Sequence, residues 1–271
     1  MNVASASDIA AARAYEALFV PALFGAWAPK LADAAGLQPG FRVLDVACGT
    51  GVLAREAARR VQPEGSVAGV DVAIGMLAVA RELAPTIEWR EGRAEALPFD
   101  DAAFDAVVSQ FGLMFFTDRP RALREMIRVA RPGAALAVAV WDAVDRHPVY
   151  AAEVALLERL AGEAAAAALR APFSLGDRDA LASSLAAAGA VSITADTRAG
   201  TARFPSLRVL VEADLRGWLP VMGVHLEDDV IDRVLAEVDA ALSPHISQEA
   251  RGEVAFPVSA HIVSARAAAS A

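Results

Sequence analysis

The chain contains little cysteine, few aromatic residues and no long apolar run. Cys48 is the single cysteine among 271 residues, which excludes an intramolecular disulfide. Hydrophobic residues make up 56% of the chain but aromatic residues only 6%, so alanine supplies much of the apolar content and favours helices. No apolar run reaches the roughly 18 residues that a membrane-spanning helix needs. We therefore expect one large α/β domain with an added cap, and no membrane span.

Positive charge and targeting signals are also scarce. Lys and Arg number 25 against 34 Asp and Glu, and the net charge of -9 disfavours binding to a nucleic-acid backbone. Residues 1–5 lack the basic region and apolar core of a secretory signal, so we expect a cytoplasmic protein. No group of His, Cys and acidic residues has metal-ligand spacing, so we expect no metal site. The expected partner is a small molecule, and a homodimer is one candidate assembly.

A turn with two glycines separates an apolar strand from a helix. The strand at residues 43–46 runs into this turn, and a second strand at 66–71 ends in Asp71. Gly49 and Gly51 have no Cβ atom to hold a ligand away from the backbone, and the next helix begins with unpaired N–H groups. This arrangement is typical of a nucleoside pocket, with the ribose near Asp71.

The same turn fits the loose dinucleotide fingerprint, because Gly49, Gly51 and Ala54 have its spacing. Asp45 helps to separate the alternatives. A carboxylate at the end of the first strand would repel a pyrophosphate, whereas it would attract an ammonium group. S-Adenosylmethionine carries an ammonium group, a ribose and an adenine, so it suits both Asp45 and Asp71.

Three ordered motifs resemble the class I S-adenosylmethionine-dependent methyltransferases. They are residues 45–51 with Asp71, residues 91–109, and residues 123–133, and together they cover roughly residues 40 to 142. Within that superfamily they look most like the branch that methylates small molecules, such as ubiquinone and menaquinone precursors. The resemblance implies a Rossmann-like, doubly wound α/β fold with seven strands, the last antiparallel, together with N-terminal helices and a helical cap.

Hydrophobic periodicity gives the expected elements. Short helices, interrupted at Pro21 and Pro29, are expected within residues 8–36. The core strands are expected at 42–46, 66–71, 86–90, 104–109 and 134–141, and the core helices at 52–61, 74–84 and 119–130. Further along we expect helices at 148–169 and 177–188, a strand at 191–204 interrupted at Gly200, two helical stretches within 206–241, and a strand at 254–265.

These elements imply a single methyltransferase domain with several parts. Residues 1–40 form the N-terminal helices, and residues 41–145 form the cofactor-binding core. The helical cap comprises residues 146–176 and 205–245, and the rest of the core comprises 177–204 and 246–271.

The resemblance also implies the cofactor site. Asp45 would hold the ammonium group, Asp71 the ribose hydroxyls, and Arg93 stands where the family usually has Asp or Asn for the adenine amino group. The full set of expected cofactor-binding residues is Asp45, Ala47, Gly49, Gly51, Asp71, Val72, Met76, Arg93, Ala94, Glu95, Ser109 and Gln110.

Local alternatives stay open for several of these positions. Asp71 could cap the helix that follows Ala73. Met76 could be a core side chain, and Ser109 with Gln110 could be an ordinary polar strand end. Cys48 could be a reactive thiol or a small residue packed under the loop.

Fewer signals point to the acceptor and to a base. Expected acceptor-side residues are Tyr15, Phe19, Phe24, Trp141, Arg216 and Trp218, although ordinary packing explains the same side chains. His147 is the first candidate for a general base and His225 the second. A base is optional, because orienting a nucleophile toward the sulfonium methyl group contributes on the order of 7–11 kcal/mol.

The sequence predicts a metal-independent transfer of a methyl group from S-adenosylmethionine to an O, N or C atom of a small organic molecule. One alternative is a non-methylating protein of the same fold, either a cyclase or a binding protein. A second alternative is an NAD(P)-dependent oxidoreductase. Asp45, the loop at residues 97–99 and the lack of a Tyr-x-x-x-Lys pair argue against the oxidoreductase.

Overall fold

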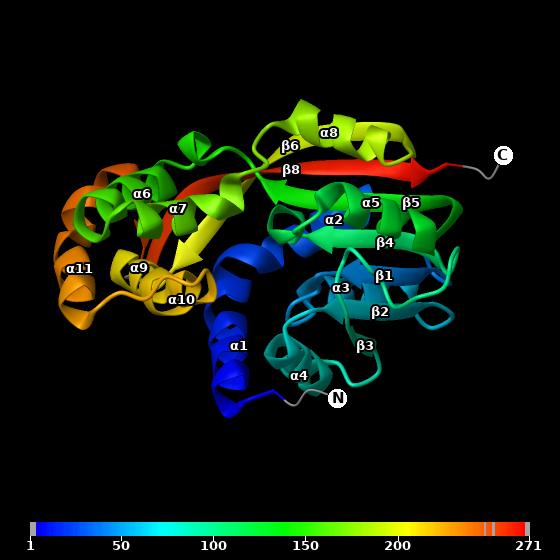
Figure 1. Ribbon diagram of the computed structural model, residues 1–271, viewed down its shortest axis with the longest axis horizontal. Coiled ribbons are helices and arrows are strands. Elements are labelled where there is room, and N and C mark those ends of the chain that lie inside the picture. The colour runs from blue at the N-terminus through cyan, green and yellow to red at the C-terminus, as the bar shows by residue number, and fades with distance from the viewer. Residues whose placement is uncertain (1–3, 247, 251–252, 269–271) are drawn as a thin grey trace. The chain divides into compact units, whose positions relative to one another are not determined.

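A computed structural model describes residues 4–246, 248–250 and 253–268 of the chain. These residues form one mixed sheet with the strand order β3-β2-β1-β4-β5-β8-β6 and its last strand antiparallel (Figure 1). The strands are β1 Arg42–Val46, β2 Ser66–Asp71, β3 Glu88–Glu91, β4 Phe104–Gln110, β5 Ala130–Trp141, β6 Ala190–Phe204 and β8 Glu253–Ala267. The predicted Rossmann-like fold with seven main strands is therefore confirmed. An additional short strand, β7 Gln248–Ala250, pairs with β8 and was not predicted.

The first five strands are parallel, so their carboxyl ends meet at one edge of the sheet. The order of the strands in the sheet changes direction between β1 and β4, because β2 pairs with one side of β1 and β4 pairs with the other. In open α/β sheets this switch point is where ligands bind. The helices of this part of the chain are α1 Ala6–Phe19, α2 Ala28–Ala34, α3 Val52–Val61, α4 Ile74–Leu83, α5 Arg119–Val129 and α8 Arg178–Ala187.

The chain divides into two compact units. Unit 1 comprises Met1–Val140, Asp177–Arg198 and His261–Ala271, and unit 2 comprises Trp141–Gly176 and Ala199–Ala260. Strands β6 and β8 each contribute residues to both units. The helices of unit 2 are α6 Pro148–Ala161, α7 Glu163–Arg170, α9 Leu207–Ala213, the π-helical segment Asp214–Trp218, α10 Leu219–Val221 and α11 Asp228–Leu242.

One helical prediction was wrong in its boundaries. The helix expected at residues 148–169 breaks at Gly162, whose φ of 89° ends α6 and precedes α7. The N-terminal segment consists of short helices as predicted: α1 ends before a π-helical turn at Val20–Phe24 that contains Pro21, and after a 3₁₀ turn at Gly25–Trp27 the helix α2 begins next to Pro29. Strand β6 is also continuous through Gly200.

The helical run Ala6–Ala34 is long and apolar enough to cross a membrane by length and composition alone, with a hydropathy of 1.3. It is the one such run in the described residues, and core helices and signal sequences meet the same criterion. In unit 1, α1 packs closely on α4, since a Cβ atom at Gly75 would lie 2.6 Å from the carbonyl oxygen of Asp8. Ser5 and Asp8 form a capping box that starts α1.

Candidate functional site

The glycine turn after β1 leaves backbone open at one point and tightly covered at another. Gly49 has φ of 55°, and nothing lies within 4 Å of the position where a Cβ atom would stand. Gly51 has φ of 86°, and a Cβ atom there would lie 2.4 Å from the Trp89 ring. Between them, the turn is closed by the Gly51 N–H, which donates to the Cys48 carbonyl oxygen at 2.8 Å. The backbone at Gly49 is thus the accessible part of the turn.

We expect Gly51→Ala to destabilise unit 1. The alanine would be strained at positive φ and would displace Trp89, whose indole N–H donates to the Ala84 carbonyl oxygen at 3.0 Å. Urea unfolding should show a loss of about 2–3 kcal/mol in the free energy of unfolding. Gly133→Ala is the matched control, because Gly133 has φ of 78° but open space at its Cβ position. Equal losses in the two variants would contradict the proposed contact with Trp89.

Asp45 ends β1 as a buried carboxylate without a hydrogen-bond donor. Its side chain is 1% exposed, and neither carboxylate oxygen accepts a hydrogen bond from a described donor. Burial raises the pKa of Asp45 well above its usual value, the nearby Ala54 N–H on α3 opposes this rise, and the charge of Asp71 adds to it. A cationic group beside Asp45 would reverse the cost of ionising it.

Asp71 ends β2 and holds the glycine turn in place. Its Oδ2 accepts the Gly49 N–H at 2.8 Å, and its Oδ1 accepts the Ala73 N–H at 2.8 Å, immediately before α4. Burial raises the pKa of Asp71, and these N–H donors oppose the rise. Asp71 therefore accepts a hydrogen bond at the start of α4, as its alternative role predicted, and its contact with a ribose stays a prediction. Nearby, Val72 is exposed and Met76 is half-buried.

Unsatisfied buried polar atoms gather at the carboxyl ends of β1 and β4, which are neighbouring strands. Besides the two oxygens of Asp45, they are Thr50 Oγ1, Ser109 Oγ and Gln110 Oε1. Ser109 lies beside the turn, since a Cβ atom at Gly112 would be 2.6 Å from Ala47 Cβ and 3.1 Å from Ser109 Oγ. Buried polar atoms in native proteins are rarely left unpaired, so this group indicates a polar ligand or ordered water.

The three predicted aromatic residues of the N-terminal segment form one cluster. Tyr15 stacks on Phe24 with ring centroids 5.4 Å apart, and Phe19 lies 6.0 Å from Tyr15. Burial raises the pKa of Tyr15, and the charges of Glu16, Asp71 and Asp45 raise it further. The Gln110 side-chain amide also donates to the Phe24 carbonyl oxygen at 3.2 Å. These residues therefore meet at the glycine turn, and a lining role stays a prediction.

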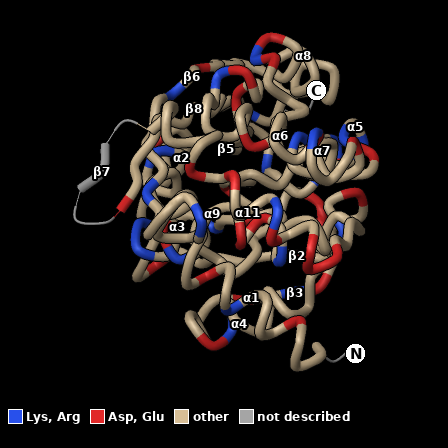
Figure 2. Tube along the Cα trace, turned by 90° about the vertical axis from the view of Figure 1, so that its left-hand side faces the viewer, with Lys and Arg blue, Asp and Glu red and all other residues tan. Residues whose placement is uncertain are grey.

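An ion pair that sequence reasoning missed ties α1 to the turn. Glu16 Oε1 accepts Arg55 Nη2 at 2.7 Å, and Arg55 Nη1 donates to the Thr50 carbonyl oxygen at 2.6 Å. Arg55 belongs to a group of basic residues on α3 (Figure 2). Glu16 and Arg55 lie far apart in the sequence, so no local pattern could have paired them.

We expect Glu16→Gln to loosen α1. Its charged contact with Arg55 is partly buried, so hydrogen exchange of the α1 amides should accelerate, and the unfolding free energy should fall by about 1 kcal/mol. Glu82→Gln is the matched control. The Arg13–Glu82 pair likewise ties α1 to another helix, in this case α4, but both of its side chains are more than half exposed. Equal acceleration of exchange in both variants would contradict a special role for Glu16.

The residues predicted on the adenine side are held by the segment that precedes α5. Glu95 Oε1 accepts the N–H groups of Thr117 and Asp118 at 2.8 and 3.3 Å. Burial opposes ionisation of Glu95, but these N–H donors and the Arg93 charge outweigh it and lower its pKa. Arg93 donates to Thr117 Oγ1 at 3.1 Å, and Ala94 is buried. Glu95 and Arg93 thus shape this loop, and their contact with an adenine stays a prediction.

Cys48 lies buried inside the turn. Burial raises the pKa of its thiol well above the usual value, and the charges of Asp45 and Asp71 add to the rise. The thiol is therefore protonated at neutral pH, which fits a packed side chain better than a reactive one.

His147, in unit 2, has both ring nitrogens engaged by backbone groups. Nδ1 lies 3.0 Å from the Ala143 carbonyl oxygen. Nε2 lies 3.0 Å from the Ser259 carbonyl oxygen and 3.1 Å from the Ser259 nitrogen. Burial lowers the pKa of His147, although its hydrogen bonds with the backbone of Ala143 and Ser259 oppose this. His225, the second candidate base, is exposed.

The acceptor-side residues predicted in unit 2 also have internal partners. Trp141 meets His147 edge to face at 6.0 Å, and the Trp218 indole N–H donates to the Ala168 carbonyl oxygen at 2.9 Å. Arg216 pairs with Glu212 and Asp228 at 3.3 and 3.0 Å. Their contact with an acceptor stays a prediction.

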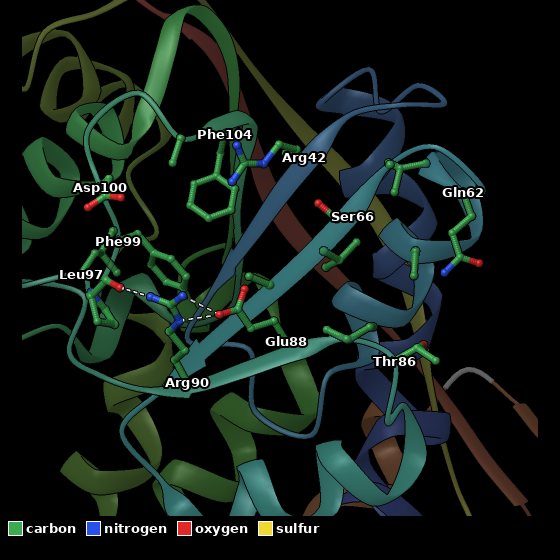
Figure 3. A pocket seen from close by; sticks show the side chains of 18 residues that line it. Arg42, Gln62, Ser66, Thr86, Glu88, Arg90, Leu97, Phe99, Asp100 and Phe104 are labelled. Atoms are coloured by element: carbon green, nitrogen blue, oxygen red, sulfur yellow. Dashed lines mark hydrogen bonds and ion pairs between the residues drawn. The ribbon is translucent and has the colours of Figure 1, made fainter.

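A cavity of about 580 Å³ lies at the opposite edge of the sheet, at the amino ends of β1 to β4 (Figure 3). Arg42 and Arg90 point into this region, where Arg90 stacks over Phe99 and pairs with Glu88. The predicted cofactor residues do not line it. It is therefore separate from the glycine turn.

Comparison with known proteins identifies the matched region. A family model described as a methyltransferase domain matches residues 43–133. The demethylmenaquinone methyltransferase of Renibacterium salmoninarum is 41% identical over 124 residues, which is 46% of this chain and 49% of that protein. The chain thus spans about half the length of the curated relatives it matches.

Solved structures show the same fold over most of the chain. The YcgJ protein of Bacillus subtilis has a TM-score of 0.58 and 18% identity, with 90% of this chain and 98% of that chain covered. The [4+2]-cyclase SpnF has a TM-score of 0.53 and 24% identity, with coverage of 91% and 82%. At these identities the likeness concerns the fold alone.

Proposed function

We propose that the protein transfers a methyl group from S-adenosylmethionine to a small organic molecule, on the premise that its residues 43–133, which match a methyltransferase domain model, bind that cofactor. The observation that carries the proposal is the group of unpartnered buried polar atoms at the ends of β1 and β4, with the Asp45 carboxylate at its centre. The relatives are named for quinone substrates but match only part of this chain. A quinone precursor is therefore the first acceptor to screen, and the atom methylated can be O, N or C.

The residues of the turn fit this cofactor. The unpaired Asp45 carboxylate suits the ammonium group of its methionine part, and the open side of Gly49 allows that part to approach the backbone. Asp71, already held by the Gly49 and Ala73 N–H groups, has lone pairs left for ribose hydroxyls. Ser109 and Gln110 supply further unpaired oxygens.

The bound cofactor supplies a methyl group already activated by the positive sulfur. The chain's own residues have to bind and orient both molecules and to exclude water. Orientation of this kind contributes on the order of 7–11 kcal/mol, so no catalytic base is required. Tyr15 and Phe24 of the aromatic cluster would exclude water beside Asp45 and Asp71.

A base role for His147 stays a prediction. Its ring would first have to release the Ala143 or Ser259 contact, since both nitrogens are engaged. We propose instead that His147 positions the start of α6, where it precedes Pro148. A cytoplasmic location and a homodimer also remain proposals, which cell fractionation and analytical ultracentrifugation would test.

The proposal is tested by incubating the protein with S-adenosylmethionine and a panel of quinone precursors, phenols and amines. Formation of S-adenosylhomocysteine with a product that gains one methylene unit supports methyl transfer. Rearrangement of an acceptor without a change in mass would favour a cyclase. Turnover of NADH in place of S-adenosylmethionine would favour the oxidoreductase.

A further inference from the structure

Two carboxyl groups are buried together in unit 2, outside the glycine turn. Glu153 on α6 has no exposed surface, and Asp214, the first residue of the π-helical segment, is 5% exposed. Both oxygens of Glu153 and Oδ2 of Asp214 accept no hydrogen bond from a described donor. The two acids lie near each other, and the charge of Asp214 adds to the effect of burial in raising the pKa of Glu153. Neither the fold nor the cofactor site explains why acids stand here.

No described cation neutralises this pair. Arg159 on α6 pairs with Glu237 on α11, and Arg216 pairs with Asp228. Burial is the first cause that raises the pKa of Glu153 and of Asp214, and no cationic side chain lowers either. A buried carboxyl pair without a cation is costly, and an arriving cation would repay part of that cost.

Aromatic rings adjoin the acid pair. Tyr150 lies one turn before Glu153 on α6 and is buried, and the charges of Asp214 and Glu153 add to burial in raising the pKa of its phenol. The Tyr150 ring lies 5.3 Å from Phe173 and 5.9 Å from Phe256. Aromatic faces beside carboxylates are the groups that recognise organic ammonium ions, because ring faces and acids both attract a weakly hydrated cation.

We propose that Glu153, Asp214 and Tyr150 form a binding site for an organic ammonium group, carried by the acceptor or by a part of it. The inference rests on the proposed function only in identifying that cation with the methyl acceptor. Because Glu153 has no exposed surface, entry requires movement of the π-helical segment. On binding, the cation replaces one proton of the pair, which leaves to solvent, so one of the two carboxyl groups becomes ionised beside the cation.

The test uses choline and its uncharged isostere 3,3-dimethylbutan-1-ol in calorimetric titrations of the full chain. We expect choline to bind and the isostere to bind at least tenfold more weakly. Glu153→Gln and Asp214→Asn should each weaken choline binding at least tenfold, and Asp229→Asn, which removes an exposed acid of α11, should not. The choline heat near pH 7 should also depend on the buffer's ionisation enthalpy, because a proton is released.

Equal binding of choline and the isostere, or unchanged choline binding in both variants, would overturn the inference. Amide variants keep the size of the side chains, and circular dichroism confirms their folding. S-Adenosylmethionine binding is measured in the same samples. If the protein binds S-adenosylmethionine but choline binding fails the test, the ammonium site alone is rejected. If the wild-type protein does not bind S-adenosylmethionine, the proposed function alone is rejected.

Discussion

Asp71→Ala is expected to lower the affinity for S-adenosylmethionine at least about 100-fold, or about 2.7 kcal/mol. The substitution removes the acceptor of the Gly49 and Ala73 N–H groups, both at 2.8 Å, and the predicted partner of the ribose hydroxyls. It therefore disturbs the glycine turn and the ligand contact together. Calorimetric titration with S-adenosylmethionine and S-adenosylhomocysteine measures the effect.

Two further variants separate these causes. Asp71→Asn keeps one oxygen acceptor for the backbone, so we expect a smaller loss of affinity than with alanine. Glu91→Gln is the control, since Glu91 lies opposite Asp71 on the neighbouring strand β3 and is an exposed acid outside the proposed cofactor site. Unchanged cofactor affinity in Asp71→Ala would contradict the assigned site.

Asp214→Asn is expected to remove a pH dependence from the stability of the protein. Burial raises the pKa of Asp214 from 3.8 to about 8 in the folded state, so the native protein keeps a proton that the unfolded chain loses. The contribution of Asp214 to the free energy of unfolding is therefore fully present below about pH 4 and is lost as the pH rises through about 8. With about 1.4 kcal/mol for each pKa unit, the rise from 3.8 to about 8 makes this loss of the order of 6 kcal/mol.

Thermal unfolding of the wild type and of Asp214→Asn between about pH 4 and pH 9 tests this dependence. The difference between the two proteins should be small at about pH 4, and the variant should be the more stable one at about pH 9. Glu237→Gln is the control, because Arg159 lowers the pKa of that exposed acid, so that Glu237 does not titrate near pH 8. A constant difference between wild type and Asp214→Asn would show that Asp214 does not titrate in this window.

The sequence predicted the elements whose patterns are local. Alternating strands and helices after residue 41 determine a parallel sheet, and the rule for strand ends places Asp45 and Asp71 at one edge. Both acids lie there in the structure. Tyr15, Phe19 and Phe24, which the sequence placed on the acceptor side, form one aromatic cluster in the structure.

Contacts between distant segments could not be predicted in the same way. The pairs Glu16 with Arg55 and Glu153 with Asp214 each join different helices, and polar residues of these types are usually exposed. The contact of His147 with Ser259 depends on β8, and the two residues lie 112 positions apart in the sequence. Gly162 was visible as a helix breaker, but its helix-forming alanine neighbours concealed the boundary.

Calorimetric titration of the purified protein with S-adenosylmethionine, S-adenosylhomocysteine and NADH tests the central claim most directly. We predict that both adenosyl compounds bind, that Asp71→Ala weakens both, and that NADH does not bind. Binding of NADH alone would contradict the assignment of the glycine turn to a methyl donor and would direct the search toward redox substrates.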